Sequence, residues 1–102
     1  MNVTIHDNES QSRYEMFLDG ELAGFEVYHL KGQAISLIHT EVVEHFAGQG
    51  LARPLVVHAL DDARARGLAV LPLCPYVAHY ISTHAEDYLD LVPEARRSEF
   101  GL

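Results

Sequence analysis

The sequence predicts an α+β fold, in which an antiparallel meander of strands is followed by a β-α-β crossover in one mixed sheet. The first half of the chain alternates apolar and polar residues and carries glycine-containing tight turns. The middle changes to helical spacing, and a short apolar run follows it. A strand, a helix and a strand in this order predict a parallel strand pair. With 102 residues, the chain is expected to form a single domain over residues 1–102.

The first half of the chain is expected to consist of strands. Residues 3–5 begin a short strand, and residues 13–18 alternate apolar and polar side chains, as a half-buried strand does. Residues 21–30 return as the next strand, and residues 33–42 form a third that is more continuously apolar. Strands that follow one another so closely pair antiparallel, so these segments predict the meander.

Two tight turns separate these strands. Asp19-Gly20 is a hairpin signal, because a type I′ turn needs positive φ at both central positions. Lys31-Gly32 is expected to form the second tight turn. The two turns place the three strands side by side in chain order.

A helix is expected to follow the meander, starting near Gly50. Apolar residues recur at helical spacing, and charged or polar residues occupy the other face. The apolar positions are Ala52, Leu55, Val56, Ala59, Leu60 and Ala63. Pro54 falls in the first turn, where backbone N–H groups lack intrahelical partners in any case, and Gly67 suits the C-terminal cap.

The last third of the chain is expected to add a strand and a second helix. Residues 68–73 form a short apolar run bounded by glycine and proline, which predicts a buried strand despite Pro72. Pro75 fits the first position of a helix that reaches about Thr83. Residues 86–102 are expected to form a turn of helix and then a fraying end.

The segment Ala47-Gly48-Gln49-Gly50-Leu51-Ala52 lies between the third strand and the first helix. Two glycines one residue apart let the backbone approach a bulky anion without interference from Cβ atoms. A helix that starts there points free N–H groups and the positive end of its dipole at the same place. The segment therefore predicts a cradle for a pyrophosphate, although ordinary turns also use glycine.

Composition excludes several classes of function. The formal net charge is −8, so nucleic acid is not expected as a partner, because phosphate backbones need clustered Lys and Arg. The acidic surface favours a cationic or amine partner, or serves solubility alone. No apolar stretch has the length of a membrane span, and residues 1–12 lack the apolar centre of a secretory signal. The single cysteine, Cys74, suits a reducing compartment, so a cytoplasmic location is expected.

Three runs of residues carry a family resemblance. They are His39-Thr40-Glu41-Val42, then Gly48-Gln49-Gly50-Leu51-Ala52, then the run from Gly67 to Ile81 that contains Cys74-Pro75-Tyr76. Together they resemble the GNAT superfamily of N-acetyltransferases, and more narrowly its short, single-domain members. The resemblance covers roughly residues 3–92. It implies a mixed sheet that splays open and holds acetyl-CoA.

The resemblance also implies where acetyl-CoA binds. The end of the third strand pairs with the pantetheine arm like an additional strand, and the backbone groups of Val42 and Val43 are implied to serve it. The loop before the first helix binds the pyrophosphate. Its implied contributors are Gly48, Gln49, Gly50, Leu51, Ala52 and Arg53.

The sequence departs from the superfamily pattern at two places. Ala47 occupies the position that usually opens the loop with Gln or Arg, so binding is expected to depend more on backbone donors. Only residues 7–12 join the first two strands, which is too short for the helices that normally help to wall the acceptor site. The acceptor of the acetyl group is therefore left open.

His39 and Glu41 are candidate bases for an acetyl transfer. They lie two residues apart on the expected third strand, so they share a face beside the pantetheine edge. Either can remove a proton from an ammonium group directly or through water. The alternative is that His39 packs and Glu41 is merely solvated at the strand end.

Cys74 is a candidate acceptor of the acetyl group. It ends a strand just before a helix start, which favours the thiolate form, and a thiolate can form a covalent intermediate. The alternative is that it behaves as a small buried apolar residue. In the family a tyrosine of the following helix often protonates the leaving thiolate, and here neither Tyr80 nor Ser82 is assigned that role.

No metal site is expected, because the seven histidines lack zinc-ligand spacing and no second cysteine supports them. His79 is the histidine whose helix faces the expected thioester end. Arg64 and Arg66 either touch a phosphate of the nucleotide or serve the C-terminal dipole of the first helix.

These features predict an acyltransferase that moves acetyl from acetyl-CoA to a primary amine of a small molecule or protein. The alternative is a non-catalytic acetyl-CoA or acyl-CoA binder, suggested by the missing wall of the acceptor site. A third possibility is a plain interaction module whose glycines only form turns.

Overall fold

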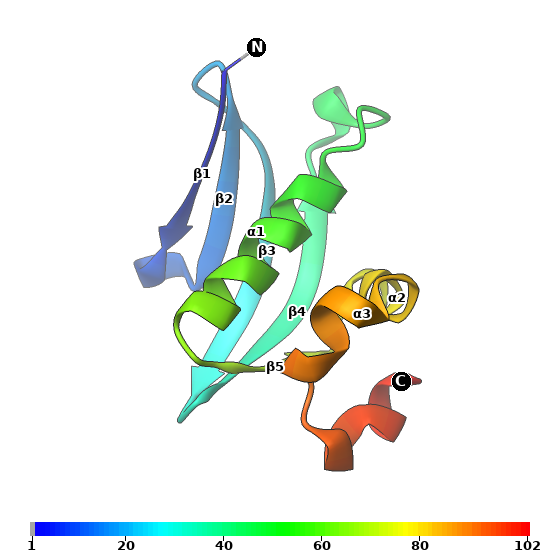
Figure 1. The fold of residues 1–102 in the computed structure, drawn as a ribbon. Coiled ribbons are helices and arrows are strands. Elements are labelled where there is room, and N and C mark those ends of the chain that lie inside the picture. The colour runs from blue at the N-terminus through cyan, green and yellow to red at the C-terminus, as the bar shows by residue number, and fades with distance from the viewer. Residues whose placement is uncertain (1) are drawn as a thin grey trace.

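A computed structural model describes residues 2–102 and contains one mixed five-stranded sheet (Figure 1). The strands lie in chain order across the sheet, and the first three pairings are antiparallel while the last is parallel. The strands are β1 (Val3–Asn8), β2 (Arg13–Leu18), β3 (Glu21–Lys31), β4 (Ala34–Val42) and β5 (Ala69–Pro72). The expected meander and the parallel pair after it are both confirmed.

The turns of the meander follow the glycine signals. Asp19 and Gly20 have φ values of 48° and 84°, as a type I′ hairpin requires. The second turn lies one residue later than expected, because Lys31 still belongs to β3 and Gly32, with φ of 61°, is the first turn residue. Each turn therefore places a left-handed conformation on a glycine, where it costs least.

Helix α1 (Ala52–Ala65) crosses one face of the sheet and connects β4 to β5 (Figure 1). The buried side of the helix consists of Leu55, Val56, Ala59, Leu60 and Ala63. The helix begins two residues after the expected position near Gly50, and Gly67 has φ of 67° just beyond its C-terminal end. The central βαβ unit is therefore confirmed with a small shift of its boundary.

The C-terminal part is more ordered than expected. Helix α2 occupies the expected range, Pro75–Thr83, and is followed by α3 (Ala85–Tyr88) and by 3-10 turns η3 (Leu89–Leu91) and η4 (Glu94–Phe100). Val92 is 1% exposed, and the Arg97 guanidinium donates to the carbonyls of Val92 and Leu89. The expectation of a fraying tail was wrong, because its apolar residues pack against the core and its polar groups have partners.

The sheet divides where β4 and β5 separate. Their pairing runs from Ala34↔Ala69 to Leu37↔Pro72, and the Cys74 amide donates to the Leu37 carbonyl at 2.9 Å. Beyond that point residues 39–42 of β4 pair only with β3, while the chain after β5 turns into α2 (Figure 1). One edge of β4 is therefore left without a strand.

A bulge lies in β4 at the same place. Val27 is opposite His39 and Tyr28 is opposite Leu37, so Ile38 is an extra residue. Leu37 therefore faces the same side of the sheet as Thr40, and His39 faces the other side. None of the helices within residues 2–102 combines the length and the hydrophobicity that crossing a bilayer requires.

Candidate active site

The loop before α1 presents unpartnered backbone donors to solvent. Gly48 and Gly50 have φ values of 83° and 71°, and nothing lies within 4 Å of a Cβ placed on either. Residues 47–50 are exposed. Within residues 2–102, no backbone N–H from Gly48 to Arg53 donates a hydrogen bond to the protein. The loop and the first turn of α1 therefore form an open group of donors at the positive end of a helix.

Arg53 adds a side-chain charge to this group of donors. It is exposed, it has no carboxylate partner within residues 2–102, and its guanidinium carbon lies 6.0 Å from the centre of the Tyr80 ring on α2. The two glycines, the helix terminus and this arginine together suit a phosphate group.

The open edge of β4 begins beside this loop. The Val43 amide donates to the Ala23 carbonyl of β3 at 2.8 Å, and the Val43 carbonyl accepts from Phe46 at the same distance. The Val43 amide therefore already has its partner, whereas its carbonyl keeps a second lone pair, so the expected contact of Val43 with pantetheine stays a prediction for the carbonyl. Because strand groups alternate in direction, the amide and carbonyl of Val42 point away from β3, toward the open edge.

A buried polar cluster occupies the point where β4 and β5 separate. Cys74 is 5% exposed, and its Sγ lies 3.3 Å from Thr40 Oγ1. The Thr40 hydroxyl donates to Glu26 Oε1 on β3. Glu26 is fully buried, and its Oε2 has no partner within residues 2–102. Burial raises the pKa of Glu26 to about 8, against the hydrogen bonds from Thr40 and the His39 backbone, which lower it.

Glu26 is a residue that sequence reasoning missed. It lies two residues after Gly24, whose missing Cβ would approach Leu55 of α1, so both residues face the helix. Tyr14, which lies opposite Glu26 on β2, is fully buried, and its hydroxyl donates to Asp62 on α1. The available signal was an ionisable residue at an inward position of a strand, where an apolar side chain is usual.

His39 and Glu41 lie together on the opposite face of β4. Their side chains are 56% and 49% exposed, and His39 Nε2 lies 2.7 Å from Glu41 Oε1. The expected shared face is therefore observed, and neither side chain packs in the core. The pair flanks Thr40 in sequence, so the open edge of β4 has an exposed acid–base pair on one face and the buried cluster on the other.

The two residues considered for the leaving thiolate, Tyr80 and Ser82, both lie on α2. Tyr80 is 8% exposed and stacks on His84, with ring centres 4.0 Å apart. The Ser82 hydroxyl donates to the His79 carbonyl within α2. His79 lines a hollow of about 300 Å³ with Ser82 and Phe100. Within residues 2–102, no three His, Cys, Asp or Glu side chains are placed to hold a metal ion.

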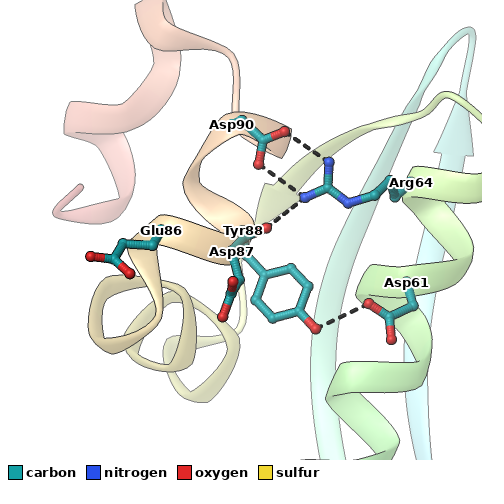
Figure 2. Close-up of a pocket in the computed structure, with 6 residues that line it drawn as sticks. All are labelled: Asp61, Arg64, Glu86, Asp87, Tyr88 and Asp90. Atoms are coloured by element: carbon teal, nitrogen blue, oxygen red, sulfur yellow. Dashed lines mark hydrogen bonds and ion pairs between the residues drawn. The ribbon is translucent and has the colours of Figure 1, made fainter.

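A second hollow, of about 460 Å³, lies at the C-terminal end of α1, away from the glycine loop (Figure 2). Arg64 binds both carboxylate oxygens of Asp90 at 2.8 and 2.9 Å and also the Asp87 carbonyl, and the Tyr88 hydroxyl donates to Asp61. The Arg64 guanidinium holds the pKa of Asp90 below its ordinary value. Eleven helical steps of about 1.5 Å separate Arg64 from Arg53, so Arg64 ties α1 to α3 and does not belong to the loop.

Arg66 is likewise paired at this end of the helix. Its guanidinium lies 3.2 Å from Asp62 and 3.7 Å from Asp7. Of the two interpretations of Arg64 and Arg66, contact with a nucleotide phosphate does not fit these positions. Both side chains instead bind carboxylates of the protein.

Comparisons with known proteins give one family. The family described as GCN5-related N-acetyl-transferase matches residues 13–91. A search of curated proteins finds no match. The sequence similarity to the family therefore covers β2 to η3 and includes the loop, the open edge and the buried cluster.

Several solved structures share the fold. A GCN5-like putative N-acetyltransferase from Staphylococcus aureus has 19% identity and a TM-score of 0.68, over 90% of this chain and 89% of that one. A ribosomal-protein-alanine N-acetyltransferase from Brucella melitensis biovar Abortus 2308 has 26% identity and a TM-score of 0.52. The match covers 58% of this chain and 44% of the length of the Brucella protein. N-acetylglutamate synthase from Neisseria gonorrhoeae, solved with coenzyme A and N-acetyl-glutamate, has 19% identity and a TM-score of 0.52, over 96% of this chain and 26% of that one.

Proposed function

The chain belongs to the family of GCN5-related N-acetyltransferases, and from that premise we propose that it transfers acetyl from acetyl-CoA to a primary amine. The observation that carries the proposal is a continuous path along β4. Unpartnered amides lie at one end of the path, an unpaired strand edge follows, and a thiol lies at the other end.

The pyrophosphate of acetyl-CoA is proposed to bind the N–H groups of Gly48 to Arg53. Phosphate groups bind helix N-termini because the free amides and the helix dipole act together. Positive φ at Gly48 and Gly50 lets the loop curve without a Cβ between the backbone and the ligand. Arg53 supplies the one full positive charge of the site, next to the first turn of α1.

The pantetheine arm is proposed to lie along residues 38–42 of β4. It carries two amide groups, which can pair with the open strand edge as a further strand would. The backbone groups of Val42 are the first that the arm meets after the loop. Five strand steps of about 3.3 Å separate Val42 from Leu37, so an extended arm leads from the loop to Cys74.

The acetyl acceptor is proposed to be a primary amine that approaches on the side of His39 and Glu41. An amine is protonated at neutral pH and must lose that proton before its nitrogen can attack a carbonyl carbon. The exposed His39–Glu41 pair can take the proton directly or through one water molecule. The net charge of −8 favours a cationic amine over an acidic acceptor.

Two assays test the proposal with the full chain. Acetyl-CoA should raise the melting temperature in proportion to its concentration, and no binding at millimolar concentration would remove the proposal. A panel of primary amines should then release free CoA thiol, measured with a chromogenic disulfide, in the presence of acetyl-CoA. A product of the expected amide mass should accompany the thiol.

A non-catalytic acyl-CoA binder is the second candidate. The short connection between β1 and β2, which contains only the 3-10 turn η1 (Glu9–Gln11), favours it because little protein walls an acceptor site there. The same assays separate the two candidates. A binder shows the thermal shift with acetyl-CoA but releases no thiol with any amine.

A further inference from the structure

We infer that Glu26 and Thr40 take up the proton of Cys74, so that the Cys74 thiolate is the first acceptor of the acetyl group. The inference rests on the proposed function, because it concerns the same site. It assigns a role to a buried carboxyl group that neither cofactor binding nor the His39–Glu41 pair uses.

The first step of the argument concerns the burial of Glu26. A carboxylate out of contact with water loses hydration, and a carboxylate oxygen without a hydrogen-bond donor recovers none of it. Glu26 is fully buried, its Oε2 has no partner within residues 2–102, and no cation lies against it there. Such a group is expensive for a small domain to keep as a structural element, and a hydrophobic residue would cost less.

The second step concerns what Glu26 is connected to. Its Oε1 accepts the hydroxyl hydrogen of Thr40, which is the only hydrogen that hydroxyl has to donate. When Glu26 is ionised, the thiol is therefore the donor in the 3.3 Å contact between Thr40 and Cys74. The hydrogens thus point from Cys74 Sγ to Thr40 Oγ1 and from there to Glu26 Oε1.

The third step is the proton transfer that this arrangement allows. From the ionised form of Glu26, which becomes the major form as the pH rises past about 8, the thiol proton passes to Thr40 Oγ1 while the Thr40 proton passes to Glu26, and no heavy atom needs to move. The products are a Cys74 thiolate and a neutral Glu26. Burial favours the neutral form of Glu26, so the environment that penalises its charge assists this transfer.

The acetyl group then moves in two balanced steps. Cys74 Sγ attacks the thioester carbonyl, a new C–S bond forms, the C–S bond to CoA breaks, and the CoA thiolate takes the proton held by Glu26. An acetyl-Cys74 and free CoA result. A neutral amine then attacks acetyl-Cys74, its nitrogen forms the amide bond, and the proton it loses returns to the sulfur. Glu26 and Thr40 act through Cys74 and are positioning residues for its proton.

Alkylation by iodoacetamide tests the relay without any substrate. Cys74 is the only cysteine, so the reaction reports its thiolate alone. At about pH 8 and above, where Glu26 is ionised, Glu26→Gln and Thr40→Val should slow alkylation about tenfold or more, while Thr40→Ser, which keeps the hydroxyl, should stay within about twofold of the unmodified protein. Glu15→Gln is the matched control, since Glu15 is also a buried glutamate but contacts Arg13 and Asn8.

Equal alkylation rates in the unmodified protein, Glu26→Gln and Thr40→Val would overturn the relay. Should Glu26→Gln fail to fold, the Thr40→Val and Thr40→Ser pair decides the same question. Because the probe is iodoacetamide, this result stands whether or not the protein binds acetyl-CoA.

Intact-mass measurement tests the acetyl-Cys74 step. Acetyl-CoA without an amine should add one acetyl group to the protein, Cys74→Ala should abolish the addition, and Glu26→Gln should slow it about tenfold. Full turnover by Cys74→Ala would overturn Cys74 as the first acceptor. Absence of any acetyl-CoA binding would instead overturn the proposed function and leave the alkylation result to judge the relay.

Discussion

The polar groups at the two ends of α1 differ in whether they have hydrogen-bond or ion-pair partners in the protein. At the N-terminal end of α1 the amides of residues 48–53 have no hydrogen-bond partners, and the Arg53 side chain has no carboxylate partner, within residues 2–102. At its C-terminal end Arg64 is bound by Asp90 and by the Asp87 carbonyl, and Tyr88 donates to Asp61 (Figure 2). The hollow of about 460 Å³ lies at the satisfied end.

In the proposed function, acetyl-CoA therefore binds at the N-terminal end of α1 and not in the larger hollow. Polar groups that already bind one another offer little to a ligand, because binding would have to replace existing bonds. Open groups on an ordered scaffold gain new bonds without losing old ones. Glu26 belongs with the open groups, since one of its oxygens has no partner.

The largest expected effect tests whether Glu26 is an unsatisfied group. Its pKa is about 8 in the folded protein and close to 4.5 in the unfolded chain, so between these values the folded state holds a proton that the unfolded chain has lost. The free energy of unfolding should therefore fall as pH rises through this window, by at most about 5 kcal/mol, and level off above pH 8. Urea unfolding at several pH values measures it.

Glu26→Gln should remove this part of the pH dependence. In contrast, Glu15→Gln should keep it: burial opposes the charge of Glu15, but hydrogen bonds from Arg13 and Asn8 hold its pKa below the ordinary value. Stability that depends on ionised Glu15 is present throughout the window and is lost only at lower pH. Parallel pH profiles for the unmodified protein and Glu26→Gln would contradict the assignment.

The next effect tests the exposed pair on β4. Glu41→Gln and His39→Gln should each lower kcat about a hundredfold, which is the low end for a general base, without changing the KM for acetyl-CoA. Glu44→Gln changes a nearby exposed carboxylate of the turn η2 (Glu44–Phe46) and serves as the control. Unchanged kcat in both β4 variants would exclude the pair as the base.

The comparison between the helix ends can be made directly with two glycines. Gly50→Val and Gly67→Val each place a β-branched residue at positive φ, 71° and 67°, with open space around the new Cβ. Both should destabilise the fold to a similar degree. Only Gly50→Val should weaken acetyl-CoA binding, by about tenfold or 1.4 kcal/mol in calorimetry. Equal affinities would show that the loop does not bind the cofactor.

The smallest effect separates two arginines of one helix. Arg64→Leu should lower the melting temperature slightly, because it releases α3, and should leave acetyl-CoA affinity unchanged. Arg53→Leu should instead weaken acetyl-CoA binding and leave the melting temperature unchanged, since Arg53 has no carboxylate partner to lose. Rising salt should weaken cofactor binding in the unmodified protein more than in Arg53→Leu.

Much of the fold could be predicted because local signals agreed with the final structure. The glycine turns, the period change at the first helix and Pro75 at a helix start each reflect backbone constraints that act within a few residues. The exposed glycine loop could be found for the same reason. The position of Cys74 could also be anticipated, since it follows closely on β5, which lies beside β4.

The parts that could not be predicted depend on contacts between distant residues. Nothing near Glu26 in the sequence indicates that it meets Thr40, or that Thr40 meets Cys74, because these two contacts span 14 and 34 residues. The Val43 amide donates to Ala23 on β3, a partner that the sequence around Val43 does not indicate. The order of the C-terminal tail arises from packing against a core formed elsewhere, which overrides its weak local preference.

The extra residue Ile38 sets which chemistry each side of β4 carries. A regular strand would turn His39 and Glu41 toward the helix and Thr40 toward water, as the alternation from Leu37 dictates. One inserted residue exchanges these orientations for the rest of the strand. This inserted residue therefore determines which side of β4 carries the solvent-exposed His39–Glu41 pair and which side carries the buried cluster with Thr40. Lengthening or shortening β4 by one residue would exchange the two sides.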